Sequence, residues 1–137
     1  MLKINQDIFD AIVNHARNEA PLEACGYLGE GGDGLVVKHY PLTNVDASEE
    51  HYSLSPEEQF AAVRQMRAAG LKLRAIYHSH PASPARPSEE DIRLAYDPDI
   101  SYVIVSLAGS QTAIKSFRIR EAAVEIEEIE VKDDKIL

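Results

Sequence analysis

The chain has 137 residues, of which 45% are hydrophobic and 27% are charged, as in ordinary soluble globular proteins. This length suits one hydrophobic core, so we expect residues 1–137 to form a single domain. The formal net charge of −9 argues against binding to DNA or RNA, which requires clustered lysine and arginine side chains.

The first third of the chain predicts a helix followed by two strands. Apolar residues at helical spacing predict a helix over Asn5–Glu19, with Asn5 as its N-cap and Pro21 just after its end. A strand-like pattern covers Leu22–Gly29, and the turn Gly31–Gly34 leads into a second strand that starts with Leu35–Val37. We therefore expect a β-hairpin soon after the first helix.

The middle of the chain predicts a polar loop, a second helix and a buried strand. The loop covers Thr43–Ser53. The helix starts at Ser55-Pro56-Glu57-Glu58, which combines a capping serine, a proline at the first helical position and a glutamate at the third, and it ends at Gly70. An apolar run then predicts a strand over Leu73–Ser79.

The last third of the chain predicts a short helix and three strands. The helix, Ser88–Tyr96, opens with a serine that Asp91 follows three residues later. The strands are expected over Ile100–Leu107, Ala113–Ile119 and Val124–Val131. The acidic segment from Glu121 to Asp134 is interpreted as a solvated strand face or chain end. Helices and hairpins in this order predict an α/β (α+β) fold with a curved mixed sheet.

The residues that carry chemistry lie at the end of the third predicted strand. His78 and His80 are two positions apart, so their side chains leave the same face of the strand, which Pro81 then ends. Asp91 lies in the first turn of the following helix. Two imidazoles and one carboxylate leave one tetrahedral position open on Zn²⁺, as in catalytic zinc sites. Such an ion lowers the pKa of a bound water from about 15.7 towards about 7.

Each of these residues also has an ordinary structural interpretation. Ser88 with Asp91 is a common helix capping box, and a lone histidine in a strand is more often a packed residue than a ligand. The metal-site hypothesis therefore depends on the combination at this spacing and not on any one residue.

The pattern His78-x-His80, followed after seven residues by Ser88 and after two more by Asp91, resembles the signature of the JAMM (MPN-plus) metallopeptidases. The upstream segment Pro21–Gly29 resembles the part of that family that carries its catalytic glutamate, and the likeness extends from the first helix to Ile119. The resemblance implies the JAMM/MPN (cytidine-deaminase-like) architecture, a peptidase activity and one zinc ion per chain.

Carried over residue by residue, the resemblance implies that His78, His80 and Asp91 bind zinc. Glu23 matches the general base, which takes a proton from the zinc-bound water and passes it to the leaving amine. Ser88 matches the serine that helps to stabilise the tetrahedral oxyanion. Only the resemblance places Glu23 at the metal, because Glu23 is far from the other residues in the sequence.

The resemblance also implies a class of substrate. Family members hydrolyse bonds after the C-terminal glycine of ubiquitin or a ubiquitin-like protein, and this chain looks similar to small bacterial members that act on ubiquitin-like sulfur carriers. The stretch between Asp91 and Ile100 has no room for the insertion that larger deubiquitinating relatives use. We therefore expect hydrolysis of a peptide or isopeptide bond after the glycine tail of such a carrier protein. That tail could lie as an added strand at a sheet edge, with Thr43–Ser53 as a flap.

Two other functional classes match parts of the sequence. Non-catalytic interaction modules also use the MPN fold, but they need neither the His-His-Asp set nor Glu23. Zinc deaminases need His-x-Glu and a Cys-x-x-Cys pair, which a chain with the single cysteine Cys25 does not supply. The released product and the oligomeric state stay open.

The remaining reactive side chains are expected to be structural. Cys25 is interpreted as a buried small hydrophobe and Arg86 as a solvated loop residue. His15, His39 and His51 have no partner at ligand spacing. No apolar run approaches the roughly 20 residues of a membrane span, and the first residues lack the apolar stretch of a signal peptide. We therefore expect a cytoplasmic protein that does not bind a membrane.

Overall fold

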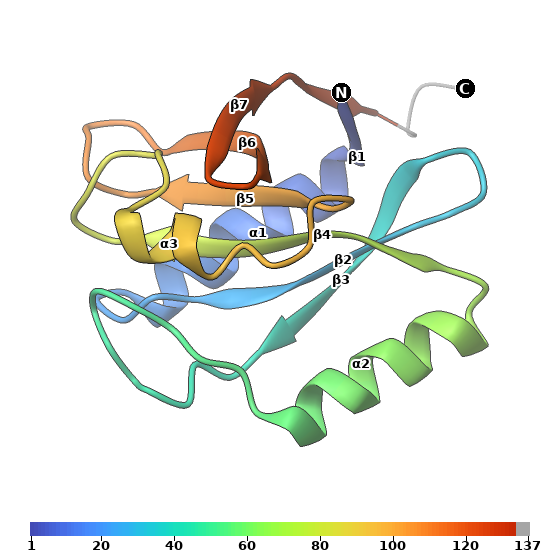
Figure 1. The fold of residues 1–137 in the computed structure, drawn as a ribbon. Helices are drawn as coiled ribbons and strands as arrows, with labels where there is room; N and C mark the ends of the chain where they lie inside the picture. Colours follow the sequence, from blue (N-terminus) through green and yellow to red (C-terminus); the bar gives the residue numbers. More distant parts are fainter. Residues whose placement is uncertain (134–137) are drawn as a thin grey trace.

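The structure, a computed structural model, describes residues 1–133, and its strands form one eight-stranded sheet. In chain order the elements are β1 (Leu2–Asn5), α1 (Gln6–Glu19), β2 (Cys25–Glu30), β3 (Leu35–Leu42), α2 (Pro56–Ala68), β4 (Lys72–His80), α3 (Glu89–Arg93), β5 (Ser101–Ser106), β6 (Ala113–Arg120), β7 (Ala123–Glu127) and β8 (Ile129–Lys132). The strand order is β7-β6-β5-β4-β2-β3-β1-β8 (Figure 1). β4 pairs in parallel with β5, and β1 pairs in parallel with β3 and β8, whereas the other neighbours are antiparallel. The predicted mixed sheet is confirmed.

The three helices cover both faces of this sheet (Figure 1). α1 packs Ile12 against one face, in a cluster that includes Leu28 and Tyr77. α2 packs Met66 against the other face, in a cluster that includes Cys25. α3 lies on this second face as well, where its apolar side packs over β5 and β6. Because strand side chains alternate between faces, each central strand contributes to both layers of the core.

The start of α2 agrees with the sequence prediction at Ser55 but differs at Glu58. The Ser55 Oγ accepts the Glu58 N–H at 3.1 Å, and Pro56 occupies the first helical turn. The Glu58 carboxylate does not complete a capping box. It accepts instead the backbone N–H and the hydroxyl of Thr43, at 2.8 and 3.0 Å. Glu58 therefore fastens the beginning of the loop of residues 43–53 to α2.

Two other helix predictions need smaller corrections. Asn5 has the extended backbone of an N-cap, but its side chain makes no capping hydrogen bond to α1. The third helix is shorter than the predicted Ser88–Tyr96, because α3 ends at Arg93 with Leu94 as its C-cap. The predicted strand over Leu22–Gly29 also starts later, since pairing in β2 begins at Cys25.

The prediction of one strand over Val124–Val131 is wrong, because this segment forms two strands at opposite edges of the sheet. β7 pairs with β6 and β8 pairs with β1, and Glu128 alone separates the two strands in sequence. The two edges of the sheet must therefore curl towards each other. β1 was too short to predict from the sequence, since only Leu2 and Ile4 follow the apolar–polar alternation of a strand.

A buried carboxylate holds the place where the two edges meet. Glu127 is 6% exposed, and it accepts hydrogen bonds from the hydroxyls of Ser101 and Ser116 and from the guanidinium of Arg74. The N-terminal amine of Met1 lies 3.3 Å from the same carboxylate. Burial opposes ionisation of Glu127, but these partners outweigh it and lower its pKa to about 2. Through these bonds the Glu127 carboxylate, at the end of β7, links β4, β5 and β6 to the place where β7 passes into β8.

The acidic segment that begins at Glu121 contributes mostly exposed side chains to β7 and β8. This agrees with its interpretation as a solvated strand face as far as Asp133, and the predicted end at Asp134 lies outside the described residues. Within residues 1–133, none of the helices is long and apolar enough to cross a lipid bilayer.

Substitution of Gly26 tests the packing of β2 against β4. A Cβ atom at Gly26 would lie 2.5 Å from the Tyr77 ring and 2.6 Å from the Tyr40 carbonyl oxygen. The Tyr77 hydroxyl is 2.7 Å from the Nδ1 of His15, so the ring cannot move away freely. We expect Gly26→Ala to lower the free energy of unfolding by about 1–3 kcal/mol in urea titrations.

Gly32→Ala is the matched control, because a Cβ atom there meets nothing within 4 Å. Its expected effect is within about 0.5 kcal/mol of zero. Equal stability of the two variants would show that Tyr77 does not pack tightly on Gly26.

Candidate metal centre

The two histidines of the predicted motif lie at the end of β4, a strand that is hydrogen-bonded on both sides. β2 pairs with one edge of β4 and β5 pairs with the other. His78 and His80 face the side of the sheet that carries α3, and the intervening Ser79 faces away from them. Both histidines are buried, and the strand ends before Pro81 as the sequence predicts.

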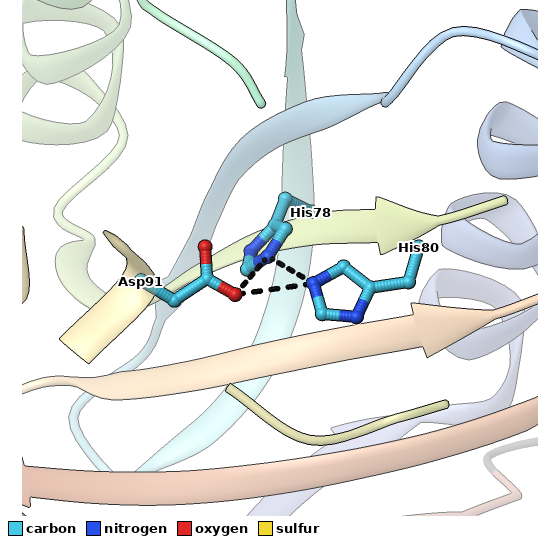
Figure 2. A group of neighbouring side chains, drawn as sticks. All are labelled: His78, His80 and Asp91. Carbon is cyan, nitrogen blue, oxygen red and sulfur yellow. Dashed lines mark hydrogen bonds and ion pairs between the residues drawn. The ribbon is translucent and has the colours of Figure 1, made fainter. Parts of the chain in front are cut away.

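Three electron-rich atoms of these residues and of Asp91 converge (Figure 2). The Nε2 atoms of His78 and His80 are 3.0 Å apart. The Oδ2 atom of Asp91 is 3.2 Å from the Nε2 of His78 and 3.1 Å from that of His80. Figure 2 shows the Asp91 carboxylate reaching from the start of α3 towards both rings. The structure therefore brings the three predicted ligands to one point.

The ring orientation of His80 is fixed by its second nitrogen. The Nδ1 of His80 lies 2.9 Å from the carbonyl oxygen of Pro84. A carbonyl oxygen only accepts hydrogen bonds, so Nδ1 carries the proton and Nε2 presents a lone pair when the ring is neutral. A backbone carbonyl behind a histidine is a common support for a metal ligand. The loop between β4 and α3 thus orients His80 for coordination.

Asp91 belongs both to the capping box of α3, whose N-cap is Ser88, and to this cluster, so its two interpretations are compatible. Its N–H donates to the Ser88 Oγ, and its Oδ2 accepts the Ser88 N–H, each at 3.0 Å. Burial opposes ionisation of Asp91, but its close contacts with the His78 and His80 rings and with the Ser88 N–H hold its pKa well below the usual range. The capping box gives the carboxylate one fixed direction, towards the histidines.

The donor set fits a divalent metal ion. Ligands about 2.0–2.1 Å from a tetrahedral Zn²⁺ ion are about 3.3 Å from one another, close to the separations found between His78, His80 and Asp91. The potential ligand atoms all lie within 4.8 Å of one another. Imidazole and carboxylate ligands without a thiolate suit zinc among the common metals. These three residues can hold a metal ion and leave one position for another ligand.

Glu23 lies just before β2, in the connection between α1 and the sheet, and the residue is 4% exposed. Its N–H donates to the Ser48 carbonyl at 2.9 Å. Within residues 1–133 its Oε1 is buried and has no hydrogen-bond partner. Burial raises the pKa of Glu23 to about 8, His80 opposes this shift, and Asp91 adds to it. The carboxylate therefore interacts electrostatically with the cluster, although it is far away in sequence.

Ser79 connects the Glu23 segment to the histidines. Its hydroxyl accepts the Ala24 N–H at 2.7 Å, and its own N–H donates to the Ala24 carbonyl at 3.0 Å. Ser79 is fully buried between His78 and His80 in the chain. The residue after Glu23 is thus fixed directly to the part of β4 that presents the two imidazoles.

Ser88 contacts Asp91 of the cluster, and its hydroxyl group can still donate a hydrogen bond. Its Oγ accepts the N–H of Asp91. In the described part of the chain the Ser88 hydroxyl has no acceptor for its own proton, and the side chain is solvent-accessible. The hydroxyl can therefore donate to a negatively charged oxygen that reaches the site.

Two residues near the cluster were not predicted from the sequence. The Tyr52 ring stacks on the His78 imidazole, with ring centroids 4.8 Å apart and an interplanar angle of 29°. The Asn44 amide donates to the Glu23 carbonyl at 3.1 Å. Both belong to the loop over 43–53, which is predicted as a polar loop and a flap, with no role assigned to any of its residues. An asparagine or tyrosine in such a loop has no spacing that indicates a role.

Within residues 1–133, none of the side chains predicted to be structural belongs to the cluster of His78, His80 and Asp91. Cys25 is fully buried, and burial raises its pKa to about 12, which confirms its interpretation as a small hydrophobe. His15 contacts Tyr77, and His51 pairs with Asp46 at 3.1 Å. Arg86 is exposed in the loop after β4.

Comparison with protein families and curated proteins identifies close relatives. A family model described as prokaryotic homologs of the JAB domain matches residues 5–120. The CysO-cysteine peptidase of Mycobacterium tuberculosis is 40% identical over 133 residues, which cover 96% of this chain and 91% of that protein. A probable TtuB-protein conjugate cleaving protease of Thermus thermophilus is 35% identical over 96 residues, 69% of this chain and 64% of that protein.

Solved structures have the same fold. A solution structure of a Desulfitobacterium hafniense protein matches with a TM-score of 0.90 and 46% identity, covering 98% of this chain and 94% of the other. A structure described as JAMM, a metalloprotease-like zinc site in the proteasome and signalosome, matches with a TM-score of 0.62 at 21% identity, over 96% and 98% of the two chains. These matches confirm the predicted JAMM/MPN fold.

The metal-binding capacity of the cluster can be measured directly. We expect the metal-free protein to bind one Zn²⁺ ion in competition with a chromophoric chelator. Asp91→Asn removes a charged ligand, so affinity should fall by at least about 100-fold. Glu89→Gln is the matched control, since it makes the same change on an exposed residue of the same helix. Equal affinities of the two variants would exclude Asp91 from the metal site.

Proposed function

The chain belongs to the family of prokaryotic homologs of the JAB domain, and from this premise we propose that it is a zinc peptidase. Its proposed reaction is hydrolysis of the peptide or isopeptide bond after the C-terminal glycine of a ubiquitin-like sulfur-carrier protein. The observation that carries the proposal is the convergence of His78, His80 and Asp91, with which the buried carboxylate of Glu23 interacts electrostatically. The proposal includes a cytoplasmic location.

The proposed metal ligands are His78, His80 and Asp91, with one zinc ion per chain. When bound, zinc supplies Lewis acidity to the scissile carbonyl and lowers the pKa of water to about 7. The Pro84 carbonyl holds the His80 ring, and the Ser88 N–H holds the Asp91 carboxylate. These backbone contacts fix the ligands before any substrate arrives.

Glu23 is the proposed general base and then the general acid. Its buried carboxylate accepts a proton from the attacking water and delivers that proton to the leaving nitrogen. The absence of a hydrogen-bond partner for Oε1 within residues 1–133 leaves this oxygen available for the transfer. A pKa above that of an ordinary carboxyl suits a group that must both accept and return a proton near neutral pH.

Ser88 is the proposed donor to the oxyanion of the tetrahedral intermediate. Its hydroxyl accepts the Asp91 N–H, which fixes the Oγ atom and leaves its proton to point elsewhere. A positioned donor at this place stabilises the charge that develops on the carbonyl oxygen.

The substrate class is supported by the relatives and by the shape of the chain. The relatives are described as acting on CysO-cysteine and on TtuB-protein conjugates, in which a protein is joined to an amino acid or to another protein. The connection from α3 to β5 covers only residues 94–100, which leaves the cluster without a large neighbouring insertion. A compact site of this kind suits a narrow, extended tail more than a second folded partner.

Glu23→Gln tests the reaction and the base together. A ubiquitin-like carrier that ends in glycine and carries an added C-terminal cysteine should lose the mass of that cysteine when it is incubated with the zinc-loaded protein. Glu23→Gln should bind zinc normally and cleave on the order of 10²–10⁴-fold more slowly. Intact-protein mass spectrometry follows the cleavage, and elemental analysis follows the zinc. Full activity of Glu23→Gln would contradict the assigned base.

Ser88→Gly tests the oxyanion donor with little effect on the helix. Glycine is tolerated at an N-cap, so α3 should lose only a few tenths of a kcal/mol, whereas the hydroxyl is removed completely. We expect cleavage of the same substrate to slow by about 10²–10³-fold with zinc retained. Ser88→Thr, which keeps a hydroxyl, should restore much of the rate; equal rates for the glycine and threonine variants would exclude a role of the hydroxyl.

A further inference from the structure

One side chain organises the loop over residues 43–53. The Asn44 amide nitrogen donates to the carbonyls of Glu23 at 3.1 Å, Ser48 at 3.4 Å and His51 at 3.0 Å. Its carbonyl oxygen accepts the N–H groups of Asp46 at 3.1 Å and Ser53 at 3.2 Å. Asn44 therefore closes the loop on itself and attaches the closed loop to the backbone of Glu23.

The backbone of Glu23 is held by this loop on both of its peptide groups. The Glu23 N–H donates to the Ser48 carbonyl at 2.9 Å, while the Glu23 carbonyl accepts the Asn44 amide. The next residue, Ala24, is bound to Ser79 of β4. Glu23 thus lies between two anchors, the Asn44-organised loop before the strand and the histidine-bearing strand after it.

The direction of the Glu23 carboxylate depends on these backbone anchors. Its Oε1 has no hydrogen-bond partner within the described residues, so no side-chain bond to that oxygen sets its position. A buried side chain without such a bond follows its backbone and its packing. A small displacement of the Glu23 backbone would therefore move the carboxylate relative to His80.

The same loop also places an aromatic ring against one of the proposed metal ligands. Tyr52, eight residues after Asn44, stacks on the His78 ring. The Asn44 amide reaches both neighbours of Tyr52 in the chain, through the His51 carbonyl and the Ser53 N–H. One amide group therefore determines where the Tyr52 ring and the Glu23 backbone lie.

We propose that Asn44 is a positioning residue, which holds Glu23 in line for proton transfer and Tyr52 against the metal ligand His78. This inference rests on the proposed function, because it assigns Glu23 the transfer of the proton. Within residues 1–133, the five side-chain hydrogen bonds of Asn44 go to the backbone of Glu23 and of its own loop, and none goes to His78, His80 or Asp91. Loss of Asn44 should reduce turnover while metal binding, which depends on β4 and α3, stays unchanged.

The test compares two Asn44 variants with a control in the same loop. Asn44→Ala removes all five hydrogen bonds, and Asn44→Asp keeps the acceptor for Asp46 and Ser53 but loses the donor to Glu23. Ser53→Ala removes a 2.6 Å hydrogen bond from the Ser53 hydroxyl to Asp46 and leaves both Glu23 anchors in place. All three proteins are loaded with zinc and assayed on the carrier with the added cysteine.

For both Asn44 variants we expect kcat to fall by about 10²-fold with KM and zinc content changed little, since a misplacement of about 1 Å can cost this much. Ser53→Ala should keep its kcat. An unchanged kcat in both Asn44 variants, or an equal loss in Ser53→Ala, would overturn the proposal, because a general loosening of the loop would then explain the result.

Amide hydrogen exchange, followed by NMR, gives a readout that does not need activity. The Glu23 N–H should exchange at least about tenfold faster in Asn44→Ala, whereas the Ala24 N–H, bound to Ser79, should stay protected. Unchanged protection of Glu23 would overturn the proposal even in an active protein. If the wild-type protein fails to cleave the carrier but the exchange result holds, the proposed function fails and the Asn44 anchor stands.

Discussion

The close approach of two imidazole nitrogens and one carboxylate oxygen is the constraint on which the rest of the structure depends. Electron-rich atoms about 3 Å apart repel one another unless protons or a cation lie between them. The sheet maintains this arrangement because β4 is paired along both edges, which keeps the histidines from turning apart. The short helix α3 holds the opposing carboxylate through its own cap. Neither element alone would bring the three atoms together.

The alternation of side chains along β4 explains how one strand serves both core and site. Tyr77 packs under α1, and Ser79 binds the segment that follows Glu23, while the histidines face the other way. The contacts of Tyr77 and Ser79 on one face therefore hold the backbone that presents the histidines on the other face. A shift of β4 by one residue would exchange the two sets and bury the histidines beneath α1.

Much of the fold and of the metal cluster is visible in the sequence, because local rules determine it. The cap at Ser55, the strand that ends at Pro81 and the spacing of His78, His80 and Asp91 are signals within short stretches. What escapes prediction depends on distant partners. The division of the last predicted strand depends on where the sheet edges meet, and the role of Asn44 depends on the loop returning to Glu23. The position of Glu23 was available only from family resemblance, since no local pattern connects it to the histidines.

The pairing of β1 with β8 has a consequence for the order of folding. Leu2 lies beside Ile129, so β1 acquires its outer neighbour only after the chain between these two residues has been made. Contacts between residues so far apart close late and slow the search for the native state. Until then the outer edge of β1 is an open hydrogen-bonding edge, which another chain can occupy. Copies of this protein are thus most prone to pair wrongly with one another before β8 has paired with β1.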